Sequence, residues 1–150
     1  MEKKMFKNAA GEQVRYLQWS VFAPVAAVVI SHGMVEHPAR YDDLARYLNE
    51  NQISVYGICH IGHGEDAKLR FHMDKGGFDR CVSNLNYLVT LARRETQVPV
   101  ILLGHSMGSF AAREYALRWG SELDGLILSG TGFFGMPLCA AGKILAKRQP

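Results

Sequence analysis

Short apolar runs that alternate with helical patterns constrain the fold of this chain more than any other feature. The runs are continuous and mostly apolar, and they occupy residues 25–30, 53–58, 100–103 and 124–129. Such runs are typical of strands that are buried on both faces of a parallel sheet. Apolar residues at helical spacing lie between them, in residues 40–51, 78–92 and 106–119. This alternation predicts an α/β fold with a mostly parallel sheet that helices cover on both faces.

The two ends of the chain depart from this rhythm. Residues 14–22 alternate loosely between apolar and polar side chains after a glycine-containing turn, which predicts a β-hairpin. Residues 133–150 are first apolar and then basic, with helical character from about Leu138 and no further strand pattern. We therefore expect the last predicted strand, at 124–129, to lie at an open edge of the sheet.

Composition and charge favour a cytoplasmic enzyme or binding domain. The 17 basic and 14 acidic residues are spread along the chain without a basic run, so we expect no nucleic-acid partner. The N-terminal segment lacks the apolar core of a signal peptide, and no stretch approaches the roughly 18 apolar residues of a membrane span. The cysteines, which are Cys59, Cys81 and Cys139, lie far apart and predict reduced thiols.

The chemistry is indicated most strongly by the segment Gly104-His105-Ser106-Met107-Gly108. It lies between a predicted strand and a predicted helix, where G-x-S-x-G forms a nucleophile elbow. The elbow lifts the serine hydroxyl above the sheet, and the flanking positions must be glycine because strand and helix pass close together there. An ordinary glycine-rich turn and a phosphate-binding loop are the alternatives, and the second lacks its required lysine. We expect Ser106 to be a nucleophile.

A second signal follows the first buried strand, in Ser31-His32-Gly33-Met34. In a hydrolase built around such an elbow, the loop after this strand supplies a backbone N–H to the oxyanion hole, and a His-Gly pair often marks it. We expect the two donors to be the N–H groups of Met34 and Met107, the residue after the proposed nucleophile.

The loop at residues 60–67 admits two further interpretations, both disfavoured. Gly62, Gly64 and Ala67 fit a dinucleotide-binding spacing, but no clear helix opens after them. His60 and His63 lack a carboxylate or cysteine partner at metal-ligand spacing. We expect no cofactor and no metal, and we expect these histidines to shape a loop near the site.

Three blocks of the sequence together identify a family. The blocks SHGMVEHPARYDDLARYL, CHIGHGE and LLGHSMGSFAAREYA resemble the monoacylglycerol lipase-like α/β-hydrolases, which include bacterial lysophospholipase-like enzymes, and the similarity runs from about Val14 to Thr131. The most diagnostic positions are His32, Gly33, Glu36, His37, Arg40 and Tyr41. The chain departs from the family where aspartate often stands, at Cys59, and where small residues are usual, at Glu65 and Asp66.

The resemblance implies a serine hydrolase of monoglyceride- or lysophospholipid-type esters that needs no cofactor. It implies an α/β-hydrolase core at residues 1–132 and the start of a helical cap at 133–150, through which the enzyme would contact a lipid surface transiently. Alternatives on the same fold are a peptidase or a thioesterase, and outside the enzymes a non-catalytic acyl-binding chain.

The rest of the triad is not apparent in this sequence. Triad residues in this fold follow the order serine, then Asp or Glu, then His. All six histidines precede Ser106, and the acids after it are Glu114, Glu122 and Asp124. We expect these acids to lie in the helix or at the start of the next strand, away from the serine. We therefore expect the 150 residues alone to lack a general base and to be inactive.

Overall fold

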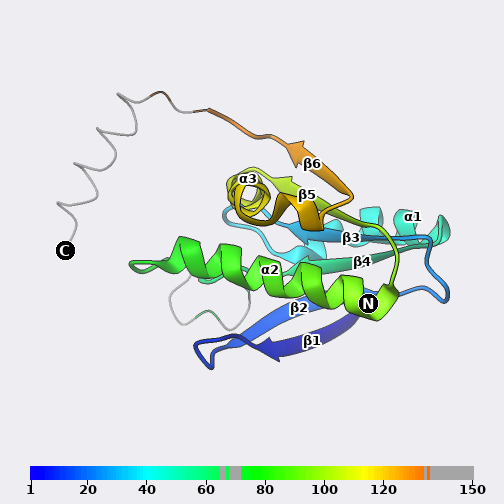
Figure 1. Ribbon diagram of the computed structural model, residues 1–150. Helices are drawn as coiled ribbons and strands as arrows, with labels where there is room; N and C mark the ends of the chain where they lie inside the picture. The colour runs from blue at the N-terminus through cyan, green and yellow to red at the C-terminus, as the bar shows by residue number, and fades with distance from the viewer. Residues whose placement is uncertain (65–66, 68–71, 134, 136–150) are drawn as a thin grey trace.

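A computed structural model describes residues 1–64, 67, 72–133 and 135 of the chain. Its described residues form one sheet with helices on both faces (Figure 1). The strands are β1 (Glu2–Lys7), β2 (Gln13–Trp19), β3 (Ala26–Ser31), β4 (Ile53–Ile58), β5 (Val100–His105) and β6 (Gly125–Ser129). The helices are α1 (Asp42–Glu50), α2 (Gly77–Thr96) and α3 (Met107–Trp119), with the 3₁₀ turns η1 (Pro38–Tyr41) and η2 (Gly120–Glu122).

The strand order brings the ends of β3, β4 and β5 together. The sheet runs β1-β2-β4-β3-β5-β6. Strand β2 is antiparallel to both of its neighbours, β1 and β4, whereas β4, β3, β5 and β6 run parallel to one another. Ser31 at the end of β3 pairs with Gly104 near the end of β5, and His105 pairs with Ser129. Parallel strands end at the same edge, and in open α/β sheets ligands bind outside that edge.

Two apolar layers hold helices against the sheet. Helices α2 and α3 pack side by side on one face, where Val29, Leu88 and Ala112 belong to the larger core (Figure 1). Helix α1 covers the other face, where Trp19 and Ala45 belong to the smaller core. The two layers leave the carboxyl edge of the sheet to the loops that follow β3, β4 and β5.

The fold predicted from the sequence is confirmed, with small differences at element ends. Strand β2 ends at Trp19, where its pairing with β4 ends, and Phe22 in the following loop is 96% exposed. The helix expected from residue 40 is preceded by η1, because Pro38 starts a 3₁₀ turn. Strand β6 ends the sheet among the described residues, and Leu126 and Ile127 on it are exposed. Most of the expected cap segment, residues 134 and 136–150, lies outside the described residues.

Candidate active site

Ser106 lies at a sharp turn between β5 and α3. Its backbone has φ 49° and ψ −118°, in a region that residues with a side chain rarely adopt. The turn is held by hydrogen bonds from the Ser106 N–H to the Ser129 carbonyl, at 2.9 Å, and from the Ser109 hydroxyl to the Ser106 carbonyl, at 2.6 Å. Ser106 is half-buried at the N-terminus of α3, where free N–H groups favour negative charge.

The glycines on either side of Ser106 allow the strand and helix to approach closely. A Cβ atom on Gly104 would lie 2.7 Å from the Cβ of Ala112 and 2.7 Å from the carbonyl oxygen of Gly108. A Cβ atom on Gly108 would overlap the carbonyl oxygen of Ser31 and lie 2.5 Å from that of His32. The helix that begins beside Ser106 therefore packs directly on the end of β3.

The loop that follows β3 lies against Ser106. A Cβ atom on Gly33 would lie 3.2 Å from the Cβ of Ser106 and 3.3 Å from Cδ2 of His105. The structure therefore brings the His-Gly segment and the elbow together, as expected from the sequence. Met34, which follows Gly33, is 62% exposed, so its side chain does not anchor the loop.

The Glu36 carboxylate organises this loop. It accepts hydrogen bonds from the Gly33 N–H, from the Tyr41 hydroxyl at 2.7 Å and from Arg40 Nη1 at 2.7 Å. Burial by itself would raise the pKa of Glu36, but the hydrogen bonds from Tyr41 and Gly33 and the charge of Arg40 outweigh it and lower the pKa. The sequence marked Glu36, Arg40 and Tyr41 only as a family pattern, and the structure shows their common role in the loop.

Glu36→Gln is expected to lower the free energy of unfolding by about 1–3 kcal/mol at pH 7, because a buried, charged acceptor is lost. The folded pKa of Glu36 lies below its ordinary value of 4.5, so its stabilisation is present above that pH and disappears as the pH falls through the folded pKa. Urea unfolding at pH 7 and pH 3 should therefore show a difference from wild type that shrinks at the lower pH.

Glu50→Gln provides the matched control for Glu36→Gln, because Glu50 is exposed at the end of α1. It is expected to change the free energy of unfolding by no more than about 0.5 kcal/mol. The role of the carboxylate would be contradicted if the two variants lost equal amounts of unfolding free energy. It would also be contradicted if the difference in unfolding free energy between Glu36→Gln and wild type did not depend on pH.

Two buried, uncharged histidines connect the ends of β3 and β4. His32 Nε2 accepts the His60 N–H at 3.1 Å, so its Nδ1 carries the proton and donates to the Gly33 carbonyl at 2.7 Å. His60 Nε2 lies 2.8 Å from the Ser31 hydroxyl. Burial lowers the pKa of His32 to about 4, and burial followed by the neighbouring histidines lowers that of His60 well below 6.5. Both rings are neutral structural parts of the edge that presents Ser106.

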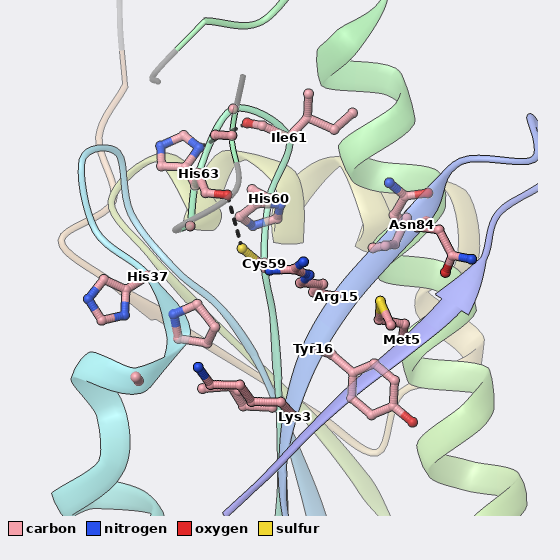
Figure 2. Close-up of a pocket in the computed structure, with 18 of the residues that line it drawn as sticks. Lys3, Met5, Arg15, Tyr16, His37, Cys59, His60, Ile61, His63 and Asn84 are labelled. Carbon is pink, nitrogen blue, oxygen red and sulfur yellow. Dashed lines mark hydrogen bonds between the residues drawn. The ribbon is translucent and has the colours of Figure 1, made fainter. Parts of the chain in front are cut away.

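A cavity of about 1100 Å³ lies beside these loops (Figure 2). The β1–β2 hairpin and the segments around His37 and His63 line it, whereas Ser106 is not among its lining residues. The turn at Ser106 and this cavity are therefore separate features of the same edge of the sheet. Among the described residues, no three His, Cys, Asp or Glu side chains form a group that could hold a metal ion.

The acids that follow Ser106 make contacts elsewhere. Glu114 pairs with Arg118 along α3, and Glu122 accepts from Tyr115. Asp124 accepts the N–H of Val100, the first residue of β5, so it lies at the end of the strand opposite to Ser106. Nδ1 of His105, the residue before Ser106, lies 3.1 Å from the Ser129 hydroxyl oxygen. These contacts place the three acids where the sequence indicated.

Two of the cysteines lie among the described residues, and both are free thiols. Cys81 is buried, Cys59 is half-buried, and neither is in a disulfide among the described residues, while Cys139 lies outside them. Cys59 Sγ donates to the His63 carbonyl at 3.2 Å. No helix in the described part of the chain is long and apolar enough to span a membrane.

Comparison with known proteins gives consistent matches. Residues 23–148 match the sequence model of the family described as serine aminopeptidase, S33. The chain is 31% identical to a monoacylglycerol lipase of Mycolicibacterium smegmatis, over 97% of this chain and 54% of that protein. It is 33% identical to the monoglyceride lipase of Rattus norvegicus, over 94% of this chain and 47% of that protein.

Among solved structures, a thermostable carboxyl esterase from Bacillus coagulans, in complex with glycerol, superposes with a TM-score of 0.82. The two are 27% identical, and the match covers 97% of this chain and 49% of the esterase. The chain therefore spans about half the length of the relatives that it matches.

Proposed function

Because this chain belongs to the serine aminopeptidase S33 family of α/β-hydrolases, we propose that it carries the nucleophile and the oxyanion hole of a serine ester hydrolase. Residues 1–132 form the N-terminal part of the hydrolase core, and residues 133–150 begin its cap. The observation that carries the proposal is the juxtaposition of Ser106, in its strained turn, with the loop that follows β3.

The reaction proceeds through an acyl-enzyme on Ser106. The Ser106 hydroxyl attacks the ester carbonyl while a general base takes its proton, and the base then gives that proton to the leaving alcohol. Water hydrolyses the acyl-enzyme in the second half of the reaction. The N–H groups of Met34 and Met107 stabilise the negative charge on the carbonyl oxygen, each with a typical effect of about 3 kcal/mol.

The general base and its orienting carboxylate come from polypeptide outside these 150 residues. Every histidine of the chain precedes Ser106, and in this fold the triad histidine follows the nucleophile. The contacts of the three acids after Ser106 also leave none beside it. The reaction needs no cofactor or metal, because the serine, the base and the backbone donors supply each step.

The substrate class is a carboxylic ester of the acylglycerol or lysophospholipid type. Relatives named monoacylglycerol and monoglyceride lipases support this choice. We place the enzyme in the cytoplasm, with transient contact to a lipid surface through its cap.

The test compares the complete product of the gene with the chain of residues 1–150, using a monoacylglycerol as substrate. The complete product is expected to show saturable hydrolysis, and the 150 residues alone are expected to show none. Without a base, a serine retains only the acceleration of the oxyanion hole and binding, about 10³-fold over water. Saturable turnover by residues 1–150, lost in Ser106→Ala, would show that the base is not missing.

An amide-cleaving activity is the second candidate, because the description of the matching family is that of an aminopeptidase. The two candidates are separated by assaying the complete gene product with a monoacylglycerol and with an aminoacyl p-nitroanilide. The ester proposal predicts the larger kcat/KM for the monoacylglycerol. A larger kcat/KM for the anilide would reverse the order of the candidates.

A further inference from the structure

We propose that His63 is a positioning residue for this reaction, whose uncharged ring holds the loop that carries the oxyanion donor Met34. The proposal rests on the proposed function and adds to it a residue from the loop after β4. His63 lies 28 residues beyond Val35 in the sequence, and the two are joined directly in the fold.

The hydrogen bonds of the ring define its protonation. The Val35 N–H donates to His63 Nε2 at 3.2 Å, and a ring nitrogen accepts an N–H only when it carries no proton. The proton therefore lies on Nδ1, which is 2.9 Å from the Ile61 carbonyl and donates to it. The ring thus connects the loop after β3 with the loop after β4.

Val35 needs such a contact because its backbone is strained. It has φ 60°, in the left-handed region, which is unusual for a β-branched residue. Its side chain is 63% exposed, so burial does not hold this conformation. If φ of Val35 returned to negative values, the peptide that joins Met34 to Val35 would rotate together with the Val35 N–H. The adjoining backbone of Met34, with its own N–H, would then be displaced.

The His63 ring is itself well fixed. It is 8% exposed, and it meets the ring of His32 edge-on with centroids 5.1 Å apart. Cys59 Sγ donates to the His63 carbonyl, which ties the loop back to the end of β4 (Figure 2). The ring can therefore act as a rigid acceptor for Val35.

Two variants separate the acceptor from the ring. In His63→Gln the longer amide places an oxygen near the position of Nε2, where it accepts the Val35 N–H. In His63→Asn the amide reaches only the position of Nδ1, so the contact with Val35 is lost. His72→Asn is the control, because the His72 residue is exposed and its side chain takes no part in the hydrogen bonds of His63 described above.

Kinetics of the complete gene product with a monoacylglycerol give the first measurement. His63→Asn is expected to lower kcat about 10- to 100-fold, with KM within about threefold of wild type. The reason is that a misplaced Met34 N–H stabilises the transition state less and leaves substrate binding unchanged. The kcat and KM of His63→Gln are expected to stay within about threefold of the wild-type values, and those of His72→Asn should equal the wild-type values. An unchanged kcat in His63→Asn, or a loss confined to KM, would overturn the proposal.

NMR gives a second measurement that does not depend on turnover. Nitrogen-15 shifts should show His63 protonated on Nδ1, and the Val35 amide should be protected from hydrogen exchange in wild type and His63→Gln but not in His63→Asn. A proton on Nε2 of wild-type His63, or a Val35 amide that exchanges freely in wild type, would refute the contact. If the wild-type product hydrolysed no ester, the proposed function would fail, and the NMR result would still decide whether His63 holds the loop.

Discussion

Ser106→Ala is expected to reduce kcat for ester hydrolysis by about 10⁴- to 10⁶-fold in the complete gene product, because loss of a triad nucleophile removes the covalent route. The expected KM is unchanged within about threefold, since the hydroxyl contributes to the transition state far more than to substrate binding. The measurement is initial-rate kinetics with a monoacylglycerol at saturating concentration.

Ser83→Ala is the matched control, because it makes the same change on the exposed surface of α2. It is expected to retain wild-type kcat and KM. Circular dichroism of both variants should match wild type, because alanine fits the space of serine. Activity in Ser106→Ala within tenfold of wild type would show that another group attacks the ester.

Gly108→Ala is expected to destabilise the protein by at least about 3 kcal/mol, at the upper end of the cost of overpacking. The added methyl group would overlap the Ser31 carbonyl oxygen and lie 2.5 Å from that of His32. Both oxygens belong to backbone at the end of β3, which cannot move without separating α3 from the sheet. Since typical domains are stable by only about 5–15 kcal/mol, the variant should be poorly folded.

Gly120→Ala tests whether this loss comes from the position and not from the change of residue. Gly120 has φ −59°, and its added Cβ would meet only Ala116 Cβ, at 4.0 Å. The free energy of unfolding of this variant is expected to rise by about 0.4–1 kcal/mol, because alanine reduces the conformational entropy of the unfolded chain. Urea unfolding measures the stability of the Gly108→Ala and Gly120→Ala variants. A Gly108→Ala variant as stable as Gly120→Ala would mean that α3 does not pack on β3 as described.

The sequence predicted most of the fold because the strands carry their signal locally. The apolar run at 25–30 can be recognised as a buried strand without reference to the rest of the chain. The bounds of β3 differ from those of this run by one residue at each end. The strained turn at Ser106 was also predictable, since glycine on both sides is required wherever a strand and helix pass so close. The end of β2 was less predictable, because it depends on where pairing with β4 stops.

The supports of the oxyanion loop were not predictable from local patterns. The contact between Val35 and His63 joins two loops through the fold, and nothing in either segment specifies the other. The left-handed conformation of Val35 is contrary to the preference of a β-branched residue. Glu36 carried a family signal, but its bond to the Gly33 N–H depends on a loop conformation that the sequence pattern does not describe.

The most direct test of the central claim is to locate a covalent adduct formed with an alkyl fluorophosphonate. Here a serine oxygen activated by a base attacks phosphorus and fluoride leaves, so the adduct marks the nucleophile. Peptide mass spectrometry of the labelled complete gene product is expected to find one adduct per chain, on Ser106. No labelling, or an adduct on another residue with Ser106 unmodified, would contradict the assignment of Ser106 as the nucleophile.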